Sequence, residues 1–175
     1  GWNFASDIGH SVAQLADNRL EVLVIPPDLM DRLRKKGSFE KLKDSIRFSS
    51  LQYLTLKEPK VTRGAKDSIE IELENYVLLS PDAINLDESN RKALQKIMNG
   101  DPLSLIEYWA IDTNYDGELF RSTWQDYRGN TDKDGDDLHV VRKARLVVDP
   151  IEGQRKVCVR AVDVFGFESE VILEV

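Results

Sequence analysis

Apolar and polar residues alternate along much of this chain, and this pattern predicts a protein built mainly from β-strands. The clearest case is residues 69–74, where Ile69, Ile71 and Leu73 alternate with glutamates. Strand side chains point alternately to two faces, so this segment is expected to have one buried and one solvated face. Similar spacing predicts further strands over residues 138–148, 155–165 and 168–175.

Two short glycine-containing turns lie between β-rich runs in the last third of the chain. The turn 114–117 separates the runs 106–112 and 118–128, and Gly166 interrupts the final pair of runs. Turns of this kind between alternating segments are typical of β-hairpins. Their order predicts an immunoglobulin-like antiparallel β-sandwich over residues 59–175.

One short amphipathic helix is expected inside this β-rich region, over residues 87–98. Asp87 can cap its first turn and Gly100 can end it, while Leu94, Ile97 and Met98 share one side. The helix is therefore expected to pack its apolar side against the sandwich.

The first part of the chain has a different pattern. Residues 1–4 resemble the end of a strand, Ser6 can cap a helix with an apolar side, and residues 20–25 form a β-like run. Strand, helix and strand in this order predict a small α/β segment over residues 1–58, the end of a larger domain. A short helix over 28–36, β-type residues over 45–57 and a boundary in the polar run 62–67 are also expected. The predicted class is thus α+β.

Charge is unevenly divided between these two parts. The net charge is −7, but residues 1–58 hold nine Lys/Arg against eight Asp/Glu, whereas residues 59–175 hold fifteen against twenty-three. Because nucleic-acid binding depends on phosphate neutralisation, this balance argues against the whole chain being a free-standing DNA binder. The single cysteine, Cys158, lies in an alternating run and is expected to have a packing role.

Two sets of basic residues are candidates for contact with DNA. A guanidinium group next to aromatic residues in 120–128 suits stacking and phosphate pairing, although burial of the aromatics in the sandwich is the more ordinary explanation. The basic helix and the segment after it are the better candidates, although a charged run on a short helix is usually a solvated face. The candidate residues are Arg32, Arg34, Lys35, Lys36, Lys41 and Lys43, followed by Arg121 and Arg128.

Two Asp-rich turns resemble parts of calcium-binding loops. The loop starting at Asp112 has alternating oxygen donors, but Thr123 stands at its twelfth position, where a carboxylate is required. The cluster of Asp132, Asp134 and Asp136 is equally ambiguous. Since Asp, Asn and Gly also fill turns for backbone reasons, we expect neither turn to bind calcium.

Several segments together resemble the C-terminal region of large prokaryotic adenine-specific DNA methyltransferases of restriction-modification type. These enzymes transfer a methyl group from S-adenosylmethionine to adenine in DNA through an Asp/Asn-Pro-Pro-Tyr/Phe motif and a glycine-containing cofactor motif. The resemblance covers nearly the whole chain, in the same order. The segments are 1–4, 24–30, 48–54, 106–112, 120–128 and 162–166.

Neither of the family's two motifs is present in this chain. Pro26-Pro27 follows Val24-Ile25 and precedes Asp28, so it lacks the residues that grip a flipped adenine. The resemblance therefore implies a cytoplasmic, non-catalytic portion of the enzyme, with no catalytic, metal or cofactor residue of its own. S-adenosylmethionine would belong to the parent protein, and the expected partners are DNA, contacted weakly or indirectly, and the rest of the methyltransferase or a restriction subunit, with no membrane.

Two other functions fit the same residues. The Asp-rich turns and acidic balance favour an extracellular or cell-surface immunoglobulin-like binding module, which the lone cysteine and the α/β segment disfavour. A cytoplasmic protein-interaction scaffold shares every feature of the methyltransferase portion except DNA.

Overall fold

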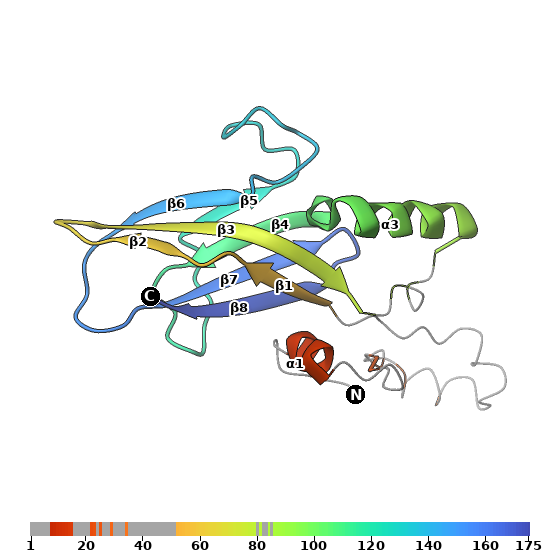
Figure 1. The fold of residues 1–175 in the computed structure, drawn as a ribbon, viewed down its shortest axis with the longest axis horizontal. Coiled ribbons are helices and arrows are strands. Elements are labelled where there is room, and N and C mark those ends of the chain that lie inside the picture. The colour runs from red at the N-terminus through yellow and green to blue at the C-terminus, as the bar shows by residue number, and fades with distance from the viewer. Residues whose placement is uncertain are drawn as a thin grey trace.

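A computed structural model of the chain describes residues 8–15, 22, 23, 25, 29, 34, 52–79, 81, 84 and 86–175. The described part consists mostly of antiparallel β-sheet (Figure 1). Its helical elements include α1 (Ile8–Leu15), α3 (Glu88–Gly100) and the 3-10 helix η3 (Pro102–Leu105). The α+β, sheet-rich class predicted from the sequence is confirmed at this level.

The first sheet is organised by one long strand, β3 (Asp67–Leu78). On one side β3 pairs successively with β2 (Lys60–Thr62) and β1 (Gln52–Leu56), and on the other side with β6 (Lys143–Val148). All three pairings are antiparallel. The pairing of β1 with β3 contains a register shift between Thr55 and Leu56, near the end of β1.

The second sheet has the order β5-β4-β7-β8, again entirely antiparallel. Its strands are β4 (Ile106–Asp112), β5 (Trp124–Tyr127), β7 (Lys156–Asp163) and β8 (Glu168–Glu174).

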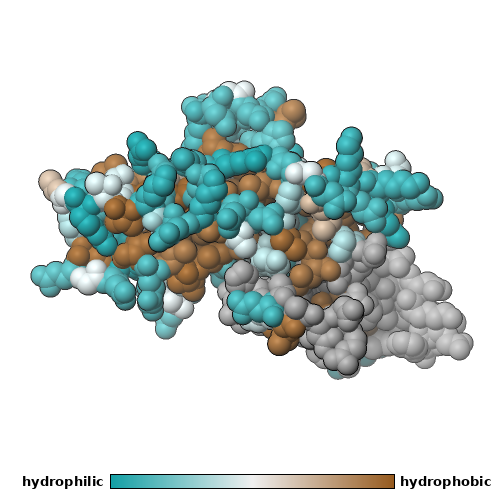
Figure 2. Space-filling model, viewed as in Figure 1, coloured by the Kyte–Doolittle hydropathy of each residue, from teal (hydrophilic) through white to brown (hydrophobic). Residues whose placement is uncertain are grey.

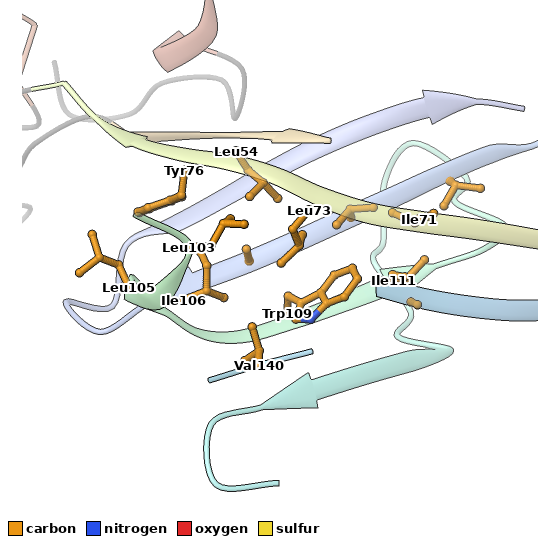
Figure 3. Close-up of a cluster of buried hydrophobic side chains, with 14 of the residues drawn as sticks. Leu54, Ile71, Leu73, Tyr76, Leu103, Leu105, Ile106, Trp109, Ile111 and Val140 are labelled. Carbon is orange, nitrogen blue, oxygen red and sulfur yellow. The ribbon is translucent and has the colours of Figure 1, made fainter. Parts of the chain in front are cut away.

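The core lies between the inner faces of the two sheets. Figure 3 shows side chains of β1 and β3 pointing toward those of η3 and β4. The indole of Trp109 is completely buried, and its Nε1 donates a 2.8 Å hydrogen bond to the carbonyl oxygen of Val141. Alternation along 138–148 and 155–165 predicts six inward positions, of which five are buried in this core and Val148 is half-buried. The five are Ala144, Leu146, Val157, Val159 and Ala161.

Helix α3 confirms the amphipathic helix expected over residues 87–98. Asp87 is its N-cap and accepts a 2.8 Å hydrogen bond from the amide of Asn90. Leu94 is buried, and Ile97 and Met98 pack against the core. The helix therefore covers part of the hydrophobic core with its apolar side.

The final hairpin is confirmed, whereas the first differs from its predicted form. Strands β7 and β8 are joined by a tight turn with Gly166 at a φ of 82°. Strands β4 and β5 do pair, but residues 113–123 form a long connection between them, and the run expected from residue 118 becomes a strand only at Trp124. Polar contacts of Asp112 and Asp116 hold residues 114–121 as a loop.

A buried carboxylate stabilises the β7–β8 turn. Asp163 Oδ1 accepts the amides of Phe165 and Phe167, both at 2.9 Å, and its Oδ2 accepts the hydroxyl of Tyr76 at 2.8 Å. Burial raises the pKa of Asp163 above its ordinary value, although these hydrogen bonds oppose that shift. The turn is thus tied to the first sheet through Tyr76.

The N-terminal predictions are tested only in part. Helix α1 is present as expected after Ser6, and Leu29 and Arg34 are helical, as the predicted helix 28–36 requires. Val22, Leu23 and Ile25 belong to neither a helix nor a strand, so no strand is found at these positions of the predicted run 20–25. Residues 1–4 lie outside the described residues. Strand β1 lies before the expected boundary at residues 58/59 and pairs with β3 across it.

None of the described helices is long and apolar enough to cross a membrane.

The shared core predicts that Ile71→Ala will strongly destabilise the protein. Ile71 is completely buried at the centre of β3, and such truncations leave a cavity and typically cost about 2–5 kcal/mol. Val147→Ala on β6 is the matched control, because Val147 is 67% exposed and its truncation should cost less than about 0.5 kcal/mol. Urea denaturation measures both values, and similar losses in the two variants would contradict the shared core.

Candidate binding surfaces

The loop between β4 and β5 uses its carboxylates to satisfy its own backbone. Asp112 is buried, and its two oxygens accept the amides of Asn114 and Arg121 at 2.9 and 2.7 Å. Asp116 accepts the amides of Glu118 and Leu119, both at 2.9 Å. Its second oxygen pairs with the Arg121 guanidinium at 2.6 Å, which together with these amides holds the pKa of Asp116 well below its ordinary value. Both carboxylates thus act as turn-forming groups.

The acidic loop after β5 is organised in a similar way. Asp126 is completely buried, and it accepts the Val141 amide at 2.7 Å, the Lys133 ammonium at 2.7 Å and the Asn130 amide group at 2.8 Å. Asp136 accepts the Leu138 amide at 2.7 Å, and this bond is the main reason that its pKa lies below the ordinary value. Across the described residues, no group of three or more His, Cys, Asp or Glu side chains is arranged to hold a metal ion.

Arg128, one of the predicted DNA contacts, is placed in a structural role. Its Nε donates to the Glu107 carboxylate at 2.7 Å, and its terminal nitrogens donate to the carbonyl oxygens of Leu138, Ser104 and Ile106 at 2.8, 2.6 and 3.3 Å. One planar guanidinium therefore joins β4, η3 and the loop before β6. Little of its donor capacity is left for a phosphate.

Arg121 and the neighbouring aromatic residues also take part in local packing. Arg121 pairs with Asp116, Trp124 packs edge-on against Trp109 with ring centroids 4.5 Å apart, and Phe120 lies under the guanidinium of Arg160 at 4.4 Å. Of the aromatic residues in 120–128 only Tyr127 is substantially exposed, at 50%, and the Arg121 side chain is 58% exposed. The segment 120–128 is therefore mainly structural, which agrees with the ordinary explanation of its aromatics.

Of the basic residues predicted around the helix 28–36, the structure describes only Arg34, which is helical and exposed. Arg32, Lys35, Lys36, Lys41 and Lys43 lie outside the described residues. Their role in DNA contact stays a prediction.

A second group of cations, which the sequence analysis did not identify, meets on the outer face of the first sheet. Lys60 on β2 and Lys143 and Arg145 on β6 extend over Glu70 of β3, with nitrogen–oxygen distances of 3.3, 3.4 and 3.0 Å. Lys143 also pairs with Glu72 at 3.0 Å, and Lys57 pairs with Glu72 from the other side. We call Lys57, Lys60, Lys143 and Arg145 the cationic face.

The cations lie outermost in this group and the carboxylates lie beneath them. The side chains of Lys60 and Arg145 are 77% and 73% exposed, whereas that of Glu70 is 13% exposed. Hydrogen bonds from Arg145 and Lys60, with further help from Lys143, lower the pKa of Glu70 to about 2. Glu70 therefore stays ionised and anchors three cations from two neighbouring strands.

The alternation of Lys143 and Arg145 with Ala144 and Leu146 was a signal that could have revealed this face. It places the two cations on the outer side of a strand, as the alternation in β3 does for Glu70 and Glu72. The pairing of β3 with β6, which joins residues more than seventy positions apart, could not be read from either segment alone.

The thiol of Cys158 is buried, and burial raises its pKa to about 12. This agrees with the expected packing role, because a thiol of this kind is scarcely ionised near neutral pH.

Comparison with protein-family models, with curated proteins and with solved structures gave no match to this chain.

Arg128→Lys is predicted to destabilise the protein because a lysine ammonium cannot reach the same spread of acceptors. Losing charge-assisted bonds to the carbonyls of Ser104 and Leu138 should cost about 1.5–3 kcal/mol in chemical denaturation. Arg121→Lys is the matched control, since its exposed pair with Asp116 is worth about 0–1 kcal/mol. If both variants lose the same small free energy of unfolding, the hydrogen bonds of Arg128 do not stabilise the fold as predicted.

Glu70→Gln is predicted to change how stability depends on acid. Between pH 4.5 and about 2, Glu70 stays ionised in the folded state while an ordinary glutamate in the unfolded chain becomes protonated. The contribution of Glu70 to the stability of the folded state is therefore present above pH 4.5 and is lost as the pH falls to about 2. The Tm difference between wild type and Glu70→Gln should shrink over this range. A Tm difference that stays constant over this range would contradict the anchoring role of Glu70.

Proposed function

We propose that this chain is a non-catalytic portion of a DNA adenine methyltransferase, and that its β-sheet module helps to position DNA through the cationic face. The observation that carries this proposal is the convergence of four exposed cations on one sheet face in a chain of net charge −7. Methyl transfer from S-adenosylmethionine to adenine would take place elsewhere in the parent enzyme.

The order of the strands supports an immunoglobulin-like module. If β1 and β2 together correspond to strand A, then β3, β4, β5, β6, β7 and β8 follow as B, C, C′, E, F and G. The two sheets would then have the orders A-B-E and C′-C-F-G, which is an immunoglobulin-type arrangement. The buried Trp109 on β4 and the buried Cys158 on β7 are at strands where such domains carry a tryptophan and a cysteine.

A non-catalytic role is supported by the way the buried polar groups are used. Asp112 and Asp163 accept backbone amides from their own turns, and Asp126 accepts the amide of Val141. Arg155 donates to the carbonyl oxygens of Thr113 and Asp149 at 2.9 and 2.5 Å. Groups held in this way stabilise loops and are not poised to exchange protons with a substrate.

Contact with DNA is supported by the low energy of the ion pairs on the cationic face. Exposed pairs are typically worth about 0–1 kcal/mol each, so the cations can turn from glutamate to phosphate at little cost. Glu70 and Glu72 lie beneath them, while Glu74 follows, exposed, farther along β3. Because four cations at most can release counterions, the proposed affinity is weak and salt-sensitive.

The test is fluorescence anisotropy with labelled duplex DNA at low and moderate salt. The double variant Lys60→Gln/Arg145→Gln should bind more weakly and lower the magnitude of the salt slope by about two units, one for each lost phosphate contact. The control Lys92→Gln/Lys156→Gln makes the same charge change on α3 and on the second sheet, and should keep the slope. Replacing Arg34, Lys35 and Lys36 by Glu tests the predicted helix separately.

Equal weakening by the first variant and the control would remove the cationic face from the DNA surface. No binding by the wild-type chain at low salt would leave docking of a partner subunit as the better function.

Docking of a protein is the second candidate, and a specific surface favours it. Figure 2 shows a hydrophobic area between the positions of β2 and β8 on an otherwise largely polar face. The extracellular binding module has no comparable support, since the carboxylates of Asp112 and Asp116 are engaged by backbone amides.

A further inference from the structure

One edge of the second sheet ends in β8, and among the described residues no strand pairs with its outer side. Arg155 and Val175 exchange both backbone hydrogen bonds, at 2.8 and 2.9 Å. In an antiparallel pair such mutual bonding recurs at every second residue. The amide and carbonyl groups of Glu170, Ile172 and Glu174 therefore point away from β7, toward the outer side.

The inner side of β8 is incompletely covered along the same stretch. On β7 the inward residues Val157 and Val159 are completely buried, but Val171, Leu173 and Val175 remain half-buried. The first sheet ends with β2, which is only three residues long. Apolar side chains are thus partly exposed next to a row of outward-pointing backbone groups, in the area of the hydrophobic surface of Figure 2.

Two other backbone carbonyls at the edges of this sheet accept side-chain hydrogen bonds, whereas no side chain among the described residues donates to the carbonyls of Glu170, Ile172 and Glu174. At the opposite edge, the Lys133 ammonium donates to the Gln125 carbonyl of β5 at 2.8 Å. At the start of β8, the Gln52 side chain donates to the Glu168 carbonyl at 2.5 Å. Proteins usually cover or charge edge strands to prevent pairing with another chain. This stretch is charged, but no described strand covers it, and half-buried apolar residues lie beside it.

Charge decides which strand could pair there. The side chains on the outer face of β8 include Glu168, Glu170 and Glu174 in alternating positions, and Ile172 between them is 51% exposed. Arg160 of β7 pairs with both Glu168 and Glu170, at 2.7 and 2.5 Å, so this row of three carboxylates and one guanidinium keeps a net negative charge, with Glu174 at its end. In a symmetric antiparallel pair of two copies centred on Ile172, Glu170 of one copy would lie opposite Glu174 of the other. Like charges directly opposite destabilise a strand pair, and the net charge of −7 also opposes self-association.

We propose that residues 170–175 of β8 are a strand-addition site for an extended segment of a different protein, in which apolar residues alternate with Lys or Arg. Its backbone would pair with Glu170, Ile172 and Glu174. Its apolar side chains would cover Leu173 and Val175, and its cations would face Glu174 and the Glu170 carboxylate that Arg160 shares with Glu168. This site is separate from the cationic face and does not depend on contact with DNA.

The test measures binding of a short fluorescein-labelled peptide of alternating valine and lysine to the whole chain. Saturable binding is expected for this peptide and not for a matched peptide of valine and glutamate. Ile172→Pro removes the outward N–H without removing a bond to β7, and should weaken binding by about tenfold. Ile172→Ala keeps the N–H and should weaken binding by less than about threefold.

Amide hydrogen exchange supplies a second measurement that does not require a variant. The amides of Glu170, Ile172 and Glu174 should exchange rapidly in the unbound chain and become protected by the valine–lysine peptide. Protection before the peptide is added would show that the edge is already paired, and would overturn the proposal. A concentration-dependent dimer in sedimentation would show that a second copy of the chain occupies the edge, and would overturn the proposal. Equal binding of the peptide by Ile172→Pro and Ile172→Ala would show that the peptide does not bind through backbone pairing at β8.

Discussion

The alternation of side chains along β3 determines both faces of the first sheet. Ile69, Ile71 and Leu73 point inward and are essentially buried, and they bring β3 against the second sheet. The same geometry places Glu70 and Glu72 on the outer face, where the cations of β2 and β6 gather around them. Because a shift of one residue would exchange the two faces, the hydrophobic core itself fixes the register of the cationic face.

Buried carboxylates solve a second problem, which is how long connections remain ordered at the ends of the strands. Asp112, Asp126 and Asp163 each lie at or near a strand end and accept amides from the residues that follow or cross it. A buried carboxylate without such donors would be costly, so each of these loops and its carboxylate stabilise one another. The many Asp residues in these loops at first favour a metal-binding interpretation. In the structure, Asp112, Asp126 and Asp163 instead accept hydrogen bonds from backbone amides.

Local patterns were sufficient to predict the strongest elements. The period-two run at residues 69–74, the Asp87 cap with Gly100 and the turn at Gly166 each carry their signal within a few residues, and β3, α3 and the last hairpin are present. The loop of the first hairpin was predicted to be shorter than it is. The hydrogen bond that holds this loop, from the Arg121 amide to the Asp112 carboxylate, joins residues nine positions apart. Propensity in residues 118–123 suggested a strand, and these polar contacts outweigh it.

Candidate function was harder to predict because it depends on pairs distant in sequence. Arg128 was selected as a phosphate contact for its charge and its aromatic neighbours, but Ser104 and Leu138 provide carbonyls that engage it in the fold. Lys143 and Arg145 gain importance only from their position across from Glu72 and Glu70. The residue type indicates which hydrogen bonds and ion pairs a side chain can form. The register of the strands decides whether partners within the fold already occupy those bonds.

The two proposed surfaces differ in how they would respond to solution conditions, and this follows from their physical basis. Binding at the cationic face rests on exposed charges and should weaken steeply with salt. Binding at β8 rests on backbone hydrogen bonds and on covering Val171, Leu173 and Val175, with charge mainly selecting the partner, so salt should weaken it much less. The two proposals therefore differ in one measurable respect: high salt should release DNA from the cationic face but should leave a strand bound at β8. The different salt dependence provides a way to assign an observed partner to one face or to the other.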